Sequence, residues 1–154
     1  MHKLAVNILA VMFICMHIYA APLCYAAAGE RCQMCGMDSS RSQTEYIVYW
    51  SNDRKETACS LHCVYLLQSF YSKDRSVAKL ETRDFYSGEF IDAKKAFYLK
   101  GSSIIPKGSM APFLPAFSDK ERAQKYGSRY GGIALDYGKA MDIVKQFDDE
   151  VGGK

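Results

Sequence analysis

The sequence predicts an α+β protein made of two small strand-helix-strand modules. Short runs of aromatic and β-branched residues alternate with runs whose apolar residues recur at the three- and four-residue spacing of an amphipathic helix. The 154 residues are 49% hydrophobic and 24% charged, a composition typical of one globular unit. We expect a signal peptide over residues 1–28, a first α+β module over residues 29–101 and a second over residues 102–154.

The N-terminal segment has the pattern of a secretory signal peptide. Lys3 precedes an apolar run over residues 4–21, and the small residues 26–28 follow it. The alternative is an uncleaved segment that attaches the chain to a membrane. A lipoprotein signal needs a small residue before its cysteine, whereas Leu23 precedes Cys24. We therefore expect a cleaved signal and an exported, periplasmic protein.

The first module is expected to have a ββαβ-like order. Aromatic and β-branched residues predict a strand, the turn residues 51–53 reverse the chain, and an amphipathic helix follows the returning strand. Further strands come after the helix. The predicted strands are residues 44–50, 55–58, 77–86, 90–91 and 96–99, and the predicted helix is residues 60–71.

The second module is expected to repeat the strand, helix, strand order after a linker at residues 101–109. Pro115 interrupts the apolar residues 113–117, which suits an edge strand. Ser118 is the predicted N-cap of a helix that ends by Gly127 or by the Gly131-Gly132 pair. A strand at residues 133–135 and a last helix capped by Asp136 complete the module.

Four cysteines remain after the expected signal peptide, in two close pairs. Cys32 and Cys35 form a Cys-x-x-Cys pair, and after 23 intervening residues Cys59 and Cys63 form a Cys-x-x-x-Cys pair. Such spacing is typical of metal sites and of disulfide frameworks. A mature chain of about 126 residues can build a core without disulfides, which are usually needed only below ~40 residues. A purely structural need for the cysteines is therefore weak.

The surroundings of the cysteines predict a metal site with a treble-clef-like start. On a helix, positions 59, 62 and 63 would share one face, and Gly36 permits a tight turn between the first two thiols. Four thiolates suit zinc, whereas added thioethers from Met34, Met37 or Met110 suit Cu(I). The methionines favour Cu(I), with zinc possible. The candidate ligands are Cys32, Cys35, Met37, Cys59, His62, Cys63 and Met110.

Several of these candidates also have a purely structural interpretation. His62 could be a satisfied core or surface imidazole, and Met110 could cover apolar surface at the start of a strand. A structural zinc module and a thiol-disulfide oxidoreductase using Cys32 and Cys35 are the alternative functions. Because positive charges are scattered among negative ones and the net charge is only +3, nucleic acid is a poor candidate partner. The chain has no Ser-His-Asp set or phosphate loop, so we do not expect an enzyme.

Several segments in a fixed order match the pattern of a known family: Cys35-Gly36-Met37, residues 59–63, residues 91–98, Met110 before Ala116-Phe117, and residues 126–132. Through these segments the chain resembles the NosL-type copper-binding accessory proteins associated with maturation of nitrous oxide reductase. The resemblance implies a periplasmic protein of two small α+β modules that binds Cu(I) and delivers it to a copper enzyme. It implies Cys35 and Met37 as the first ligands and Met110 as a thioether from the second module.

Overall fold

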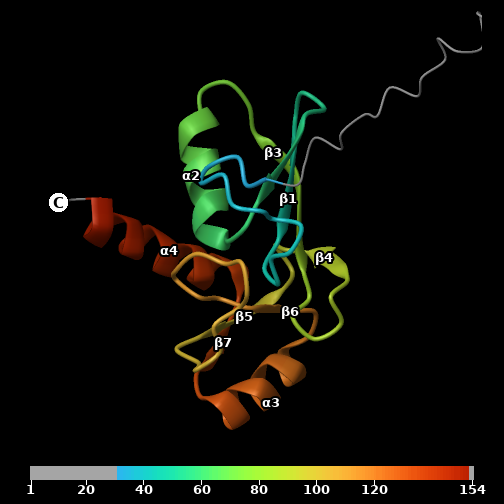
Figure 1. Cartoon of the computed structure of the whole chain (residues 1–154), viewed down its shortest axis with the longest axis vertical. Coiled ribbons are helices and arrows are strands. Elements are labelled where there is room, and N and C mark those ends of the chain that lie inside the picture. The colour runs from blue at the N-terminus through green and yellow to red at the C-terminus, as the bar shows by residue number, and fades with distance from the viewer. Residues whose placement is uncertain (1–30, 153–154) are drawn as a thin grey trace, which may run out of the picture.

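Two antiparallel sheets, one in each half of the molecule, organise the chain in a computed structural model that describes residues 31–152 (Figure 1). The predicted signal peptide lies outside the described residues. The predicted α+β class is confirmed. The elements are β1 Tyr46–Trp50, β2 Lys55–Ala58, α2 Leu61–Tyr71, β3 Val77–Arg83, β4 Phe90–Asp92, β5 Phe97–Lys100, β6 Ala116–Phe117, α3 Lys120–Tyr130, β7 Ile133–Leu135 and α4 Tyr137–Gly152.

The first sheet has the strand order β2-β1-β3-β4, and α2 packs against it. Alternate residues of β1, namely Tyr46, Val48 and Trp50, are buried, as expected when one face of a strand meets a core. The apolar face of α2 contributes Val64 and Leu67 to the same core. This sheet and helix form the frame that carries the second pair of cysteines.

The second sheet has the order β6-β5-β7 and packs against α3. The sequence analysis grouped β5 with the first module, but β5 pairs with β6 through Tyr98 and Ala116 and with β7 through Leu99 and Ala134. The chain therefore passes from one sheet to the other between β4 and β5, and the predicted linker at residues 101–109 lies within the second half.

The helix α3 begins one residue later than the sequence predicted. Ser118 was the expected N-cap, but the Oδ1 atom of Asp119 accepts a hydrogen bond from the Arg122 N–H at 2.7 Å, so Asp119 is the cap. The Ser118 N–H instead donates to Asp84 Oδ2 at 2.7 Å. The cap predicted for the last helix is confirmed, since Asp136 Oδ1 accepts from the Lys139 N–H at 2.9 Å.

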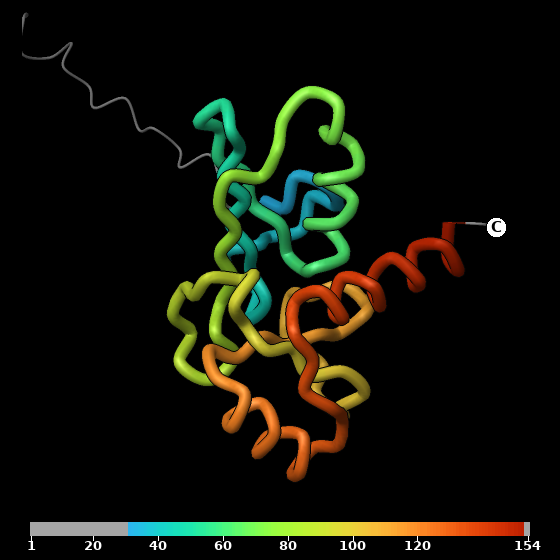
Figure 2. Tube along the Cα trace, turned by 180° about the vertical axis from the view of Figure 1, so that it is seen from behind, coloured from blue at the N-terminus to red at the C-terminus, as the bar shows by residue number. Residues whose placement is uncertain are grey.

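The last helix connects the two halves. It contacts both α2 and β5, and its buried residues Ala140 and Val144 belong to the main core. Its C-terminal end projects away from the body of the molecule in both views (Figures 1 and 2). Within residues 31–152, no helix is both long and apolar enough to cross a membrane.

Candidate metal centre

A tight loop positions the first two cysteines. The Cys32 N–H donates to the Met37 carbonyl at 2.7 Å, and the Gly36 N–H donates to the Cys32 carbonyl at 2.8 Å. Gly36 has φ +72°, a conformation that side chains with a Cβ disfavour. The loop is thus folded back on itself with both thiols at its mouth, as the Cys-x-x-Cys-Gly sequence predicted.

The loop is fixed to β2 by hydrogen bonds around Thr57. The Thr57 carbonyl accepts from the Gln33 N–H at 3.0 Å, and the Thr57 hydroxyl donates to the Arg31 carbonyl at 2.9 Å. The Ser39 hydroxyl donates to the Thr57 hydroxyl oxygen at 3.0 Å. Because Thr57 lies two residues before Cys59, these bonds set the distance between the two cysteine pairs.

Cys59 lies before α2, and Cys63 lies in its first turn. Both were expected on one helical face, but the helix begins at Leu61, and its N-cap Ser60 accepts a hydrogen bond from the Cys63 N–H at 3.2 Å. The Cys59 carbonyl accepts from the Ser42 and Thr44 hydroxyls at 3.0 and 2.8 Å. Cys59 is therefore oriented by side chains of a distant segment and not by the helix.

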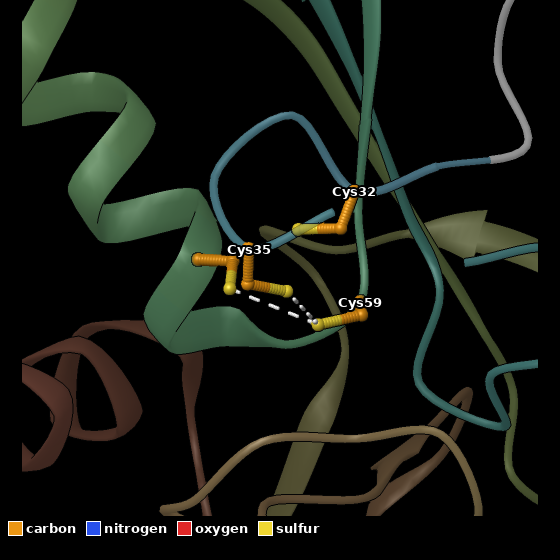
Figure 3. Close-up of side chains that lie close together, drawn as sticks. Cys32, Cys35 and Cys59 are labelled. Atoms are coloured by element: carbon orange, nitrogen blue, oxygen red, sulfur yellow. Dashed lines mark hydrogen bonds between the residues drawn. The ribbon is translucent and has the colours of Figure 1, made fainter. Parts of the chain in front are cut away.

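The four thiols converge on one point. Their sulfur atoms all lie within 4.8 Å of one another, with Cys35 Sγ 3.5 Å and Cys63 Sγ 3.7 Å from Cys59 Sγ. Figure 3 shows the side chains of Cys32, Cys35 and Cys59 pointing toward one another. A tetrahedral site with metal–sulfur bonds of ~2.3 Å has sulfur–sulfur edges of about 3.8 Å. The arrangement therefore fits a single thiolate-bound metal ion with little movement.

The four thiols differ in their access to solvent. Cys59 and Cys63 are completely buried and Cys32 is 2% exposed, whereas Cys35 is exposed at the tip of its loop. An incoming ligand would therefore meet Cys35 first. Three of the four candidate thiol ligands are thus buried and one is exposed.

The close packing of the thiols changes their acidity. Hydrogen bonds from the Cys59 and Cys63 thiols hold the pKa of Cys32 far below its usual value. The same hydrogen bonds to Cys32 raise the pKa of Cys63 to about 12, and donation to Cys32 also raises the pKa of Cys59 strongly. One thiolate thus collects hydrogen bonds from its neighbours. A soft metal ion would replace the protons of the other thiols, since metal ligation requires thiolates.

A thioether from the second half adjoins the thiols. Met110 Sδ lies 3.8 Å from Cys63 Sγ, and the Met110 side chain is half-buried against the main core. Met37 also packs against this core, and its carbonyl closes the Cys32 loop. Met34 is 37% exposed on the same loop. Among the methionines in residues 31–152, Met110 is the one whose sulfur lies within hydrogen-bonding distance of a thiol.

His62 lies apart from the thiols. Its Nε2 atom is 3.0 Å from Asp148 Oδ1, and its ring packs edge-on against Phe147 with a centroid distance of 5.3 Å. Both partners belong to α4. The structure thus brings together five predicted ligands, Cys32, Cys35, Cys59, Cys63 and Met110, and it places His62 in a contact between α2 and α4.

Several polar residues that shape the site were not among the predicted site residues. Ser42 and Thr44 hold the Cys59 carbonyl, Gln43 contacts the loop that carries Met110, and Thr57 holds the Cys32 loop. The polar run at residues 38–44, so close to a cysteine pair, is the one local signal that could have indicated them. Its bonding partners are distant in sequence and cannot be deduced from spacing.

Together, the fold and the sulfur cluster define a small α+β protein with a candidate soft-metal centre. The NosL family model matches residues 23–144, and the chain belongs to the NosL family. The fold is similar to the crystal structure of the copper chaperone NosL from Shewanella denitrificans. The TM-score is 0.58 at 19% identity, over 70% of this chain and 87% of that chain. None of the curated proteins matches the chain.

Proposed function

We propose that this protein is an exported copper-binding accessory protein that holds one Cu(I) ion and delivers it to a copper enzyme of the nitrous oxide reductase type. The observation that carries this proposal is the convergence of four thiols and one thioether at a site where only one thiol is exposed. Membership of the NosL family and the fold shared with a copper chaperone support it.

The chemistry of the donors favours Cu(I) as the cargo. Thiolates and thioethers are soft ligands, and a thioether is a poor ligand for zinc in comparison with a fourth thiolate or an imidazole. The Met110 sulfur beside Cys63 therefore argues for copper. The imidazole of His62, a common zinc ligand, contacts Asp148 through Nε2, and neither of its ring nitrogens belongs to the cluster of four thiols. The residues that would bind the copper ion are Cys32, Cys35, Cys59, Cys63 and Met110. Met37 offers a further thioether from the same loop as Cys35.

Delivery requires a site that opens one ligand at a time. Cys35 is the exposed ligand, so a thiol or imidazole of the client would displace it first. In that exchange a new metal–ligand bond forms as the bond to Cys35 breaks, and an entering thiol's proton passes to the released Cys35 thiolate. The copper ion stays Cu(I) throughout, and the three buried thiols hold it until further exchange.

Anaerobic metal competition tests the choice of cargo. The reduced protein without its first 28 residues is titrated with Cu(I) against a chromogenic chelator in the presence of excess zinc. We expect about one tightly held Cu(I) per chain and release of any bound zinc, because soft ligands prefer Cu(I). Zinc that resists displacement by Cu(I) would contradict the proposal.

A structural zinc module is the second candidate function. The burial of Cys32, Cys59 and Cys63 favours it, since structural zinc sites are closed, four-coordinate cages. In that case zinc removal should unfold the first half, and apo nitrous oxide reductase should gain no copper from the protein. Incubation of the Cu(I)-loaded protein with the apo enzyme, followed by copper analysis of the separated enzyme, distinguishes the two functions.

Export and the non-enzymatic role need separate tests. The signal-like segment at residues 1–28 supports export to a periplasm, and fractionation of cells that express the whole chain checks it. A binding role predicts no acceleration of insulin reduction beyond that of free thiols. Rapid turnover that depends on Cys32 and Cys35 would instead indicate a thiol-disulfide oxidoreductase.

A further inference from the structure

The loop that carries Met110 is hydrogen-bonded to the first half through one residue, Gln43, which uses both its backbone N–H and its side chain. Gln43 contacts Lys107 twice: the Gln43 N–H donates to the Lys107 carbonyl at 3.0 Å, and the Lys107 N–H donates to Gln43 Oε1 at 2.9 Å. Both backbone groups of Lys107 are thus satisfied by one residue. We call these two Gln43–Lys107 hydrogen bonds the clamp. Because Lys107 lies three residues before Met110, the clamp governs where the thioether is held.

The next residue of the loop allows the close approach. Gly108 has φ +69°, and a Cβ built at this position would lie 3.1 Å from Ser42 Cα. A larger residue would be strained by its backbone conformation and would push the loop away from Ser42. The absence of a side chain at Gly108 therefore lets the loop rest directly on the segment that contains Gln43.

The same short segment also positions a thiol. The hydroxyls of Ser42 and Thr44 donate to the Cys59 carbonyl at 3.0 and 2.8 Å, while Gln43 between them holds the Met110 loop. Residues 42–44 therefore fix Cys59 of the first half and the Met110 loop of the second half relative to each other. The Ser42 and Thr44 contacts are buried, whereas the Gln43 contact is exposed and open to competition.

We propose that Gln43 is a positioning residue that controls copper release by holding residues 101–113 as a strap, with Met110 against the thiol cluster. This inference rests on the proposed copper function. With the clamp closed, the thioether lies beside the thiols. It can take the ligand position that opens when Cys35 is displaced, so the ion keeps four sulfur ligands and its loss is retarded. A partner that competes for the exposed Gln43–Lys107 contact frees the strap, removes the thioether and leaves Cu(I) on thiols that the partner's ligands can displace.

The test compares Cu(I) release from the loaded protein to bicinchoninate for wild type, Gln43→Ala, Gln43→Glu, Met110→Leu and the Gln43→Ala/Met110→Leu double variant. We expect Gln43→Ala to speed release by about fivefold, the factor for one net hydrogen bond. Gln43→Glu keeps an acceptor for the Lys107 N–H and should restore slow release. The double variant should release no faster than Met110→Leu, because the clamp acts only through the thioether. Gln124→Ala on α3, an exposed residue of the same type, is the matched control.

Hydrogen exchange of the metal-free protein provides a readout that does not need copper. Amides of residues 101–113 should exchange faster in Gln43→Ala than in wild type and should recover in Gln43→Glu, while thermal midpoints stay close. Unchanged hydrogen exchange of residues 101–113 in Gln43→Ala would overturn the inference. It would also be overturned if the increases in release rate caused by Gln43→Ala and Met110→Leu multiplied in the double variant. If Gln43→Ala speeds exchange of residues 101–113 but the protein binds no Cu(I), the proposed function is refuted. The role of Gln43 in holding the loop is then still supported.

Discussion

Cys63 Sγ and Met110 Sδ lie 3.8 Å apart although 47 positions separate the two residues in the chain. Cys63 belongs to the first turn of the helix on the first sheet, and Met110 belongs to the loop before β6 of the second sheet. The sulfur cluster thus spans both halves of the molecule.

The buried and exposed cysteines should respond differently to substitution. Cys59→Ala should abolish tight Cu(I) binding and also destabilise the metal-free protein by about 1–3 kcal/mol, because it leaves a cavity in a fully packed position. Cys35→Ala should weaken Cu(I) binding while changing the metal-free stability by less than about 0.5 kcal/mol, since Cys35 is exposed. Urea unfolding without metal and Cu(I) competition with metal measure the two effects. Equal stability losses in both variants would contradict the assigned burial.

The two candidate thioethers should not be equivalent. Met110→Leu and Met37→Leu both remove a sulfur at nearly constant volume, which typically costs less than ~1.5 kcal/mol of stability. We expect Met110→Leu to weaken Cu(I) retention more strongly, because its sulfur already contacts Cys63 Sγ. Sulfur coordination counted by X-ray absorption at the copper edge should fall by one in Met110→Leu. A larger effect of Met37→Leu would mean that copper draws the Cys35 loop into a different arrangement.

His62 should stabilise the fold without binding the metal. His62→Ala removes the contact with Asp148 and the packing on Phe147, so we expect a loss of about 1–3 kcal/mol in stability. A double-mutant cycle with Asp148→Ala should reveal a favourable coupling energy between the two residues. Copper stoichiometry and affinity should stay unchanged. A tenfold loss of Cu(I) affinity in His62→Ala would instead support ligation by the imidazole.

Asp84 should make the stability of the folded protein depend on pH in the acidic range. Burial alone would raise the pKa of this carboxyl, but the hydrogen bonds from Ser118, Ser87 and Tyr86 outweigh it and hold the pKa below its ordinary value of 3.8. Because the folded-state pKa is the lower one, the carboxylate's contribution is present above the ordinary pKa and is lost as the pH falls through the folded-state value.

The substitution Asp84→Asn isolates this contribution. An amide offers one acceptor oxygen in place of two, so we expect a loss of about 1–3 kcal/mol at neutral pH. The difference from wild type should shrink as the pH falls below about 4, because the wild-type carboxyl then becomes protonated. Unfolding curves between pH 7 and pH 2 for both proteins measure the effect. A difference that stays constant with pH would show that the loss comes from packing.

The approximate positions of the strands and helices could be predicted from the sequence, because each depends on residues that are close together in the chain. The aromatic and β-branched residues predicted a strand over residues 44–50, and the structure has one at Tyr46–Trp50. The apolar spacing predicted a helix over residues 60–71, and the structure has one at Leu61–Tyr71. The cap of α3 was displaced by one residue because both Ser118 and Asp119 can accept from a helix N-terminus. The long-range contact with Asp84 engages the Ser118 N–H and leaves Asp119 as the cap.

The sequence by itself determined the α+β class, the cysteine spacing and the soft character of the donors. Only the tertiary structure decided which donors meet. Cys59 owes its orientation to the Ser42 and Thr44 hydroxyls, and His62 turns to Asp148 because α4 packs beside α2. Similarly, β5 joins the second sheet because its partners β6 and β7 lie later in the chain. Periodicity and capping act over a few residues, whereas these choices depend on contacts between segments that approach only when the core is packed.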